Sequence, residues 1–176
     1  LDAFKNFNKI KKTIIVFNKK HKNHLNKLNL KNILKIRGGK TRQESTFIAL
    51  KKIKRMGCKK VLIHDAARPN FTIGLLTKLI DSLKKNKASI PVISSKDSIK
   101  YKVKKQLFNL NRKNSYLTQT PQAFKFKDIY DLSIKQKNKI QDEATLFIEN
   151  NLKIKFIKGE NLNDKITFKE DILRTK

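Results

Sequence analysis

Short runs of β-branched and aliphatic residues alternate along the chain with stretches in which apolar residues recur at helical spacing. The short runs predict strands, and the second spacing is typical of amphipathic helices. The predicted strands are residues 13–17, 33–36, 61–64, 89–93 and 153–157. The predicted helices are residues 41–56, 73–83, 127–134 and 142–150. Pro91 in the fourth strand indicates an edge strand or a bulge, because proline has no N–H for a ladder.

Strands that alternate with helices of this length predict a single α/β domain with a mostly parallel sheet and helices on both faces. Ligands bind such sheets beyond the carboxyl ends of the strands. This rule directs attention to Gly38–Arg42 and Asp65–Arg68, each of which follows a predicted strand. Residues 96–111 are polar and strand-like without a helix, so they predict a surface hairpin or an arm used in assembly.

Lysine dominates the composition and gives a formal net charge of +29. Such a charge is compatible with a nucleic-acid or anionic-membrane surface. The lysines are scattered from end to end, however, which favours solvated faces, and a positive field would also attract a small anionic substrate such as a nucleotide. Nucleic acid is therefore not the expected partner. A membrane is not expected either, since no apolar run approaches the roughly 20 residues of a membrane span.

Cysteine usage bears on the compartment. Cys58 is the only cysteine, so an intramolecular disulfide and a multi-cysteine metal site are both excluded. A reducing compartment is the natural interpretation.

The turn after the third strand reads His-Asp-Ala-Ala-Arg-Pro over residues 64–69. Its acid and arginine can form a structural pair that holds a loop. They can also place the acid beside a metal-bound nucleotide and the arginine near a phosphate or hydroxyl. The residues alone leave both interpretations open. His64 has strand neighbours, so we expect it to be packed rather than catalytic.

Three other turns carry polar groups. Residues 38–45 begin with two glycines that let a backbone approach a ligand, and they lead into a helix start that can hold an anion. The same residues fit a tight turn in which Thr41 is the N-cap and Glu44 its capping-box partner. Residues 119–122, Gln-Thr-Pro-Gln, are either polar groups on a stiffened chain or a plain turn. Lys165 is either functional or one more surface lysine.

Taken in order, these stretches resemble one family, 2-C-methyl-D-erythritol 4-phosphate cytidylyltransferase of the non-mevalonate isoprenoid pathway. The matching residues are 38–45, 61–69, 97–100, 119–122, 142–144 and 163–167. The resemblance implies a Rossmann-like α/β fold of the nucleotide-diphospho-sugar transferase type. It implies transfer of CMP from CTP to 2-C-methyl-D-erythritol 4-phosphate with release of pyrophosphate, and Mg²⁺ bound mainly through the CTP phosphates.

The resemblance also implies roles for single residues. Lys165 would steady the α-phosphate and Asp65 would lie beside the nucleotide and the incoming alcohol, so these two are the expected catalytic residues. No residue is expected to be a metal ligand. The nucleotide would be held by Gly38, Gly39, Ser45 and Ala66. The acceptor would be contacted by Arg68, Ser98, Arg112, Thr120 and Gln141, the last in place of the usual threonine.

In the family, the arm matching residues 96–111 reaches into the partner's site, so a homodimer with a composite site is expected. The family also opens with a strand and a Gly-rich loop that bind the triphosphate. That segment has no match here, because Leu1 corresponds to the helix that follows it. We therefore expect residues 1–176 to be one cytidylyltransferase domain without this segment, and to be inactive alone. The expected location is the bacterial cytoplasm or a plastid-like compartment.

Three alternatives remain. One is a cytidylyltransferase for another phosphorylated alcohol, such as ribitol 5-phosphate. Another is a basic nucleic-acid-binding module without catalysis, which would not explain residues 64–69 and 119–122. The last is a degenerate, non-catalytic remnant.

Overall fold

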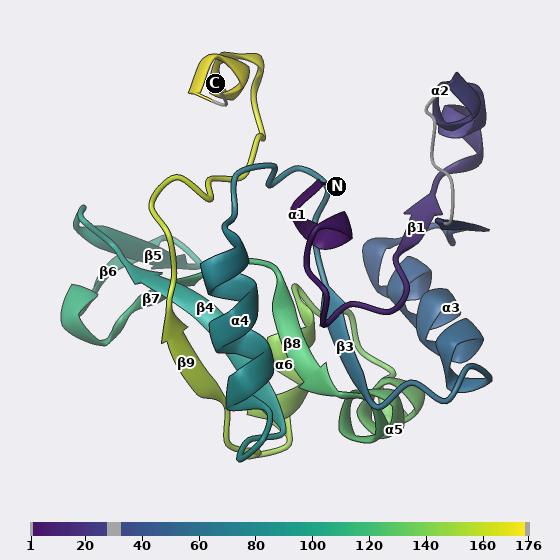
Figure 1. Ribbon diagram of the computed structural model, residues 1–176. Coiled ribbons are helices and arrows are strands. Elements are labelled where there is room, and N and C mark those ends of the chain that lie inside the picture. Colours follow the sequence, from purple (N-terminus) through teal and green to yellow (C-terminus); the bar gives the residue numbers. More distant parts are fainter. Residues whose placement is uncertain (1, 28–32, 175–176) are drawn as a thin grey trace.

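The strands and helices predicted from the hydrophobic pattern are all present, each within two residues of its predicted limits. The computed structural model describes residues 2–27 and 33–174 (Figure 1), so Leu1 lies outside the described residues. The helices are α1 (Asp2–Lys5), α2 (Lys22–Lys27), α3 (Arg42–Lys54), α4 (Ile73–Ser82), α5 (Phe126–Lys135) and α6 (Glu143–Glu149), with 3₁₀ turns η1 (Lys19–His21), η2 (Arg112–Asn114) and η3 (Lys169–Arg174). The strands are β1 (Ile14–Phe17), β2 (Leu34–Arg37), β3 (Lys60–Ile63), β4 (Ala88–Ser94), β5 (Ile99–Val103), β6 (Gln106–Leu110), β7 (Tyr116–Thr118), β8 (Gln122–Lys125) and β9 (Lys155–Lys158).

The α/β class is confirmed, but the strand pairing is mixed rather than mostly parallel. Parallel pairing occurs between β1 and β2 and between β4 and β9. The strands β7 and β8 lie antiparallel to β4, and β8 also pairs antiparallel with β3. The reason lies in the connection: a hairpin, not a crossover helix, joins β4 to β7, and a chain that returns without a crossover pairs antiparallel.

Pro91 lies in a central strand, so the expectation of an edge strand is wrong. On one side β4 pairs with β9, and Pro91 is in register with Ile157. On the other side β8 pairs with residues 88–89 and β7 with residues 92–94, which leaves a break in the ladder opposite Pro91. The Pro91 carbonyl accepts a hydrogen bond from Gln119 N–H in this break. In a strand the nitrogen and the carbonyl of one residue point to the same side. The nitrogen of Pro91 therefore faces the break between β8 and β7, where the ladder needs no N–H donor.

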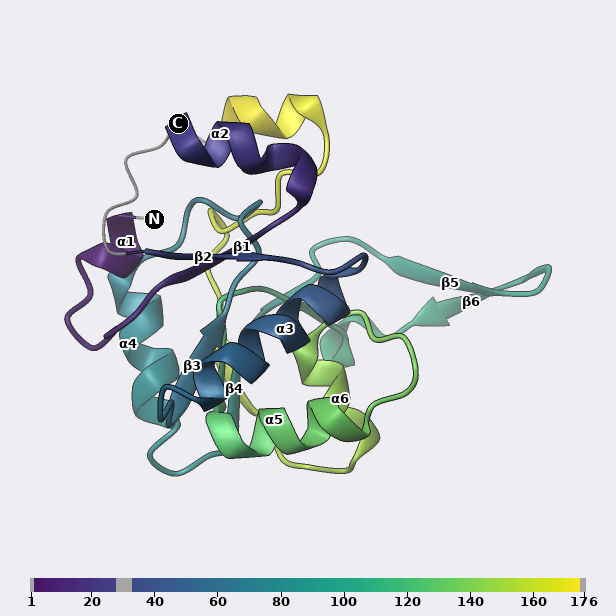
Figure 2. The ribbon, with the colours of Figure 1, turned by 90° about the vertical axis from the view of Figure 1, so that its right-hand side faces the viewer.

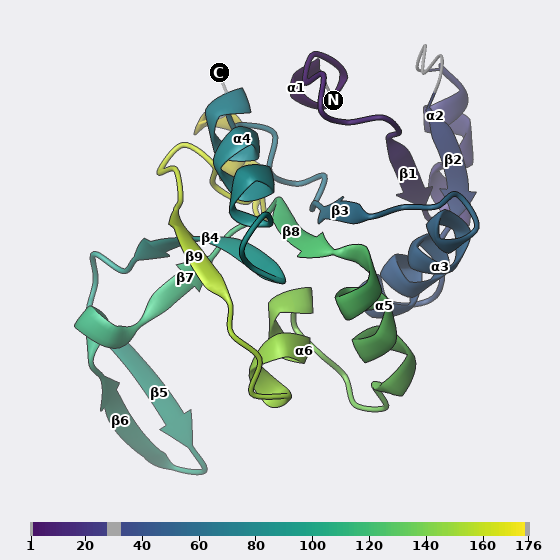
Figure 3. The ribbon, with the colours of Figure 1, turned by 60° about the horizontal axis from the view of Figure 1, so that its bottom comes forward.

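Helices cover both faces of the sheet, as Figure 3 shows for α4 on one side and α5 and α6 on the other. The α4 side holds a core of Phe7, Phe71, Leu75, Leu76, Leu79, Leu83 and Ala123. The opposite core joins α3, α5 and α6 to the sheet through Leu50, Ile53, Ala88, Ile90, Val92, Phe124, Phe126, Ile129, Ala144, Leu146 and Phe147. The two cores pack against both faces of the sheet, and the polar turns lie at the strand ends.

The strands β5 and β6 form the predicted hairpin, which projects from the body of the domain in Figure 2. Tyr101 and Phe108 stack on it with ring centroids 5.3 Å apart. We call residues 96–111 the arm.

Across residues 2–27 and 33–174, no helix is long and apolar enough to cross a membrane.

Candidate functional site

The centre of the site is the carboxylate of Asp65, which follows β3. Its Oδ1 accepts a hydrogen bond from Arg42 Nε at 2.9 Å, and its Oδ2 lies 3.2 Å from Lys165 Nζ. Arg42 comes from the first turn of α3 and Lys165 from the segment after β9. Three polar stretches that the sequence singled out separately therefore meet at one carboxylate.

A second carboxylate, Glu143 at the start of α6, is buried behind this pair. Its two oxygens accept hydrogen bonds from Arg42 Nη1 and Nη2, both at 2.8 Å. A bidentate arginine–carboxylate pair of this kind is among the strongest interactions that protein side chains make. Arg42 thus joins a buried acid on one side to the Asp65 carboxylate on the other.

Charge, more than burial, sets the ionisation of Asp65. Burial alone would raise the pKa of Asp65, but the positive charges of Arg42 and Lys165 outweigh it, so the pKa lies below its usual value. Burial likewise acts to lower the pKa of Arg42, and Glu143 and Asp65 more than offset it. Asp65 is therefore an ionised carboxylate at neutral pH.

The turn before α3 brings its two glycines against side chains of the helix. A Cβ at Gly38 would lie 2.6 Å from Ser45 Oγ, and one at Gly39 would lie 2.2 Å from Glu44 Cδ, so a side chain at either position would displace the Ser45 or Glu44 side chain. Gly39 N–H donates to Ser45 Oγ at 3.1 Å. Ser45, an expected nucleotide-binding residue, thus holds the loop that carries both glycines.

Thr41 is the N-cap of α3, as predicted: its hydroxyl oxygen accepts the Glu44 N–H at 3.1 Å. The return bond of the box differs, because the Glu44 carboxylate accepts from Lys40 N–H at 2.7 Å. The glutamate therefore fixes the residue before the cap and tightens the glycine turn.

His64 is packed, as expected, against the rings of Phe4 and Phe71. Its Nε2 lies 3.0 Å from the Arg68 carbonyl oxygen, which can only accept, so Nε2 carries the proton. Its Nδ1 lies 3.1 Å from Thr120 Oγ1, which itself accepts the Asp65 N–H at 3.0 Å. Burial lowers the pKa of His64 to about 4, and the neutral ring fastens the turn to Thr120.

Arg68 donates to backbone carbonyls, through Nη1 to Asn163 at 2.8 Å and through Nη2 to Thr118 at 3.3 Å. Ile166 N–H donates to the Ala67 carbonyl at 2.8 Å. These bonds hold the segment that carries Lys165 against the turn that carries Asp65. Arg68 therefore holds a loop, but through backbone carbonyls, and the expected structural pair of Asp65 with Arg68 is replaced by pairs of Asp65 with Arg42 and Lys165.

The glutamines of residues 119–122 are buried and each ties down a neighbouring loop. Gln119 Nε2 donates to the Glu160 carbonyl at 2.8 Å and its Oε1 accepts the Glu160 N–H at 3.0 Å. Gln122 Nε2 donates to Asp142 Oδ2 at 2.8 Å, and its Oε1 accepts the Ala144 N–H. The motif is a turn, as one interpretation held, and it also fixes the start of α6, which carries Glu143.

The remaining expected residues lie around this cluster or on the arm. Ala66 is exposed on the Asp65 turn, and Gln141 is exposed just before α6. Ser98 and Arg112 lie at the base of the arm, where Ser98 Oγ accepts from Lys100 Nζ and Arg112 Nη1 donates to the Lys96 carbonyl. The structure thus joins Asp65, Lys165 and Thr120 directly and leaves the arm residues outside their hydrogen-bond network.

Arg42 and Glu143 are site residues that the sequence did not single out as such. Both stood inside stretches that matched the family, but each is simply the first residue of a helix, Arg42 of α3 and Glu143 of α6. The sequence carried no signal for this pair, because the burial of Glu143, which is 1% exposed, is set by the fold. A buried glutamate requires a cation, and the fold shows that this cation is Arg42.

The fold and the cluster at the strand ends define an α/β domain of the nucleotidyltransferase type. Residues 1–176 match the family described as IspD: 2-C-methyl-D-erythritol 4-phosphate cytidylyltransferase, and the chain belongs to that family.

Three similar proteins illustrate the match. The chain is 51% identical over 172 residues to the bifunctional enzyme IspD/IspF of Pelagibacter ubique, covering 98% of this chain and 46% of that protein. It is 38% identical over 141 residues to the 2-C-methyl-D-erythritol 4-phosphate cytidylyltransferase of Caldicellulosiruptor saccharolyticus, covering 79% of this chain and 62% of that one. The crystal structure of 4-diphosphocytidyl-2C-methyl-D-erythritol synthase from Anaerococcus prevotii superposes with a TM-score of 0.87 at 36% identity, covering 98% of this chain and 80% of that one. The chain thus spans about half to two thirds of the length of these curated relatives.

Proposed function

We propose that the protein transfers CMP from CTP to 2-C-methyl-D-erythritol 4-phosphate, giving 4-diphosphocytidyl-2-C-methyl-D-erythritol and pyrophosphate. One observation carries the proposal in this chain. The glycine turn, the Asp65 turn and the Lys165 segment, which match the family in sequence, meet at the Asp65 carboxylate. Family membership gives the reaction its substrates.

The reaction is an in-line displacement at phosphorus. A phosphate oxygen of the acceptor forms a bond to the α-phosphorus of CTP, and the bond from that phosphorus to the bridging oxygen breaks. The electron pair leaves with pyrophosphate. Such a reaction needs positioning and charge neutralisation more than covalent help from the protein.

Lys165 is placed to supply part of that neutralisation. Its side chain is 47% exposed, while the Asp65 side chain that it contacts is 18% exposed. An exposed ion pair is weak, so the ammonium group can exchange its carboxylate partner for a phosphate at small cost. Asp65 would thus hold the ammonium beside the site until the α-phosphate takes its place.

Mg²⁺ is proposed to arrive on the CTP phosphates and to neutralise their charge. Over residues 2–27 and 33–174, no group of three or more His, Cys, Asp or Glu side chains could hold a metal ion. Both oxygens of Asp65 are engaged by cations. We propose that the ion is bound through its nucleotide.

The test is pyrophosphate release from CTP and 2-C-methyl-D-erythritol 4-phosphate with Mg²⁺. It uses the full-length protein. The proposal expects pyrophosphate release that requires both CTP and the acceptor. Activity with ribitol 5-phosphate alone would move the function to another alcohol.

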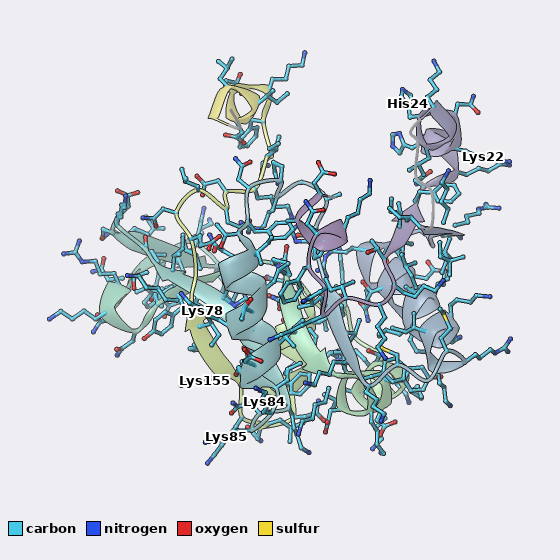
Figure 4. The ribbon with its side chains drawn as sticks, in the orientation of Figure 1. Lys22, His24, Lys78, Lys84, Lys85 and Lys155 are labelled. Carbon is cyan, nitrogen blue, oxygen red and sulfur yellow. The ribbon has the colours of Figure 1, made fainter. Side chains whose placement is uncertain are left out.

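If no acceptor gives pyrophosphate release and the protein binds duplex nucleic acid in a salt-sensitive way, the function moves to nucleic-acid binding. In Figure 4, Lys78, Lys85 and Lys155 lie near one another around α4 and β9, and Lys22 lies apart from them on α2. The nucleic-acid alternative leaves the Asp65 turn and residues 119–122 without a role, which favours the enzyme.

We also propose that the arm mediates a homodimer. Val103 and Leu107 are 50% and 71% exposed on it, beside the stacked pair Tyr101 and Phe108. A two-stranded hairpin is marginal in water by itself, and a second copy of the chain would cover these side chains. Light scattering after chromatography is expected to give twice the protomer mass, and the Leu107→Glu variant the protomer mass. A monomeric unmodified protein would contradict the proposal.

The proposed location is the bacterial cytoplasm or a plastid-like compartment, where Cys58 would stay reduced.

A further inference from the structure

Four charged side chains of alternating sign form a continuous chain through the site: Glu143, Arg42, Asp65 and Lys165. They come from α6, from α3, from the turn after β3 and from the segment after β9. The two inner members touch partners on both sides. The two ends differ sharply in environment, since the side chain of Glu143 is 2% exposed and that of Lys165 is 47% exposed.

The buried end fixes Arg42. A buried carboxylate is tolerated only beside a well-aligned cation, and Arg42 meets both of its oxygens at 2.8 Å. The guanidinium is planar, so two bonds to Glu143 also fix the direction of the third donor, Nε. That donor points at Asp65 Oδ1 at 2.9 Å.

We infer that Arg42, locked by Glu143, is a positioning residue that holds the Asp65 carboxylate with its second oxygen turned to Lys165. The inference rests on the proposed function, because the value of this arrangement lies in the transfer step. Lys165 is the movable cation, free to turn to a phosphate. Arg42 is the fixed one, and it keeps Asp65 in place when Lys165 leaves.

Two other titratable side chains, His64 and Arg68, lie near Asp65 but do not hold its carboxylate. His64 donates to the Arg68 carbonyl and Arg68 to the carbonyls of Asn163 and Thr118, so neither hydrogen-bonds the carboxylate. Hydrogen bonds from side chains to the Asp65 oxygens come from Arg42 and Lys165. Removing Arg42 should therefore release the carboxylate on one side.

The experiment compares three variants of the full-length protein: Arg42→Lys, Glu143→Gln, and the double variant Arg42→Gln/Glu143→Gln. The double variant removes both buried charges together, so no unpaired carboxylate remains in the core. Arg55→Gln and Glu149→Gln are the controls, because both side chains are exposed and lie at the far ends of the same two helices. Each variant is first checked for a cooperative melt.

The first readout does not depend on activity. The Asp65 carboxyl carbon is followed by NMR as pH is changed, with its signal assigned by its loss in Asp65→Asn. We expect the pKa of Asp65 to rise in the double variant, which removes a cation. We expect the pKa of Asp65 to fall in Glu143→Gln, because Asp65 is then the only carboxylate that pairs with Arg42. Shifts of the Asp65 pKa in opposite directions would show that Glu143 acts on Asp65 through Arg42. An unchanged pKa of Asp65 in both variants would overturn the inference.

The second readout is turnover. Arg42→Lys keeps the positive charge but loses the planar guanidinium that bonds both oxygens of Glu143. In this variant kcat should fall at least about tenfold, while KM for CTP changes less than about threefold. Equal kcat in this variant and the unmodified protein would also overturn the inference. If the unmodified protein shows no transfer but Asp65 titrates as expected, the proposed function fails and the positioning of Asp65 stands.

Discussion

Lys165 Nζ lies 3.2 Å from Oδ2 of Asp65, although one hundred positions separate the two residues in the sequence. The contact depends on backbone pairing nearby, since Ile166 N–H donates to the Ala67 carbonyl and Arg68 donates to the Asn163 carbonyl. The lysine segment is therefore docked on the turn by its main chain. The Lys165 side chain itself remains half exposed and free to change partner.

Removing this ammonium should abolish most of the proposed transfer without harming the fold. We expect Lys165→Ala to lower kcat/KM by about 10²–10³-fold, the usual effect of losing one charge-stabilising group in a transition state. Stability should change by less than about 0.5 kcal/mol, because an exposed ion pair contributes little. Pyrophosphate release and a urea titration measure the two effects.

Lys158→Ala is the matched control for Lys165, since that lysine is also exposed and lies nearby in sequence at the end of β9. It should retain full activity. A loss of less than about threefold in Lys165→Ala would remove Lys165 from the proposed mechanism.

The sequence predicted the fold where the hydrophobic pattern is local. Helices α3 and α4 and strands β3 and β4 carry their own periodicity, and their limits were correct within two residues. The strands β7 and β8 were missed, because they are short and residues 119–121 interrupt them. Their antiparallel pairing with β4 depends on the path of the chain through the arm, which no local pattern encodes.

The site was predicted unevenly for the same reason. The Asp65 turn could be found because it follows a strand at the ligand-binding edge of an α/β sheet. The pairing of Arg42 with Glu143 could not be found, since 101 positions separate the two residues and no local sequence pattern around either indicates its partner. Lys165 looked like one lysine among many, and only the resemblance marked it out.

The two glycines Gly39 and Gly74 should respond to the same substitution in opposite ways. Gly39→Ala places a Cβ 2.2 Å from Glu44 Cδ, so the exposed Glu44 side chain must leave Lys40 N–H, and we expect a loss of about 0.5–1.5 kcal/mol, the usual contribution of one hydrogen bond. Gly74→Ala meets Thr72 Oγ1 at 3.4 Å, an ordinary contact inside α4, and should gain about 0.5 kcal/mol.

Urea midpoints at neutral pH give both values. KM for CTP should also rise in Gly39→Ala alone. Equal stability changes in the two variants would refute the close-packing account of the glycine turn.

His64 should make the stability of the domain depend on pH below neutrality. Its pKa of about 4 in the folded chain lies below the ordinary 6.5, so the unfolded chain binds a proton that the folded chain does not. Stability is then present above pH 6.5 and falls as pH drops toward 4. From pH 7 to pH 5 the loss from this residue is about 2 kcal/mol.

Urea titrations of the unmodified protein and His64→Gln at both pH values isolate this contribution, because glutamine does not titrate. His24→Gln, an exposed histidine on α2, is the control and should keep the full pH dependence. An identical pH dependence in His64→Gln and the unmodified protein would show that burial of the His64 ring is not its source.

Substitutions of Arg68 and Arg112 should distinguish a structural arginine from one that contacts the acceptor. The resemblance assigns both to the acceptor, but Arg68 is fixed between the Asn163 and Thr118 carbonyls, whereas Arg112 is exposed at the base of the arm. Lysine cannot reproduce two divergent guanidinium bonds. We expect Arg68→Lys to lose about 1–2 kcal/mol of stability and Arg112→Lys to lose none that a urea titration detects. In Arg112→Lys the KM for the acceptor should rise while the KM for CTP stays constant. If Arg68→Lys were as stable as the unmodified protein and only its acceptor KM rose, the loop-holding role of Arg68 would be wrong.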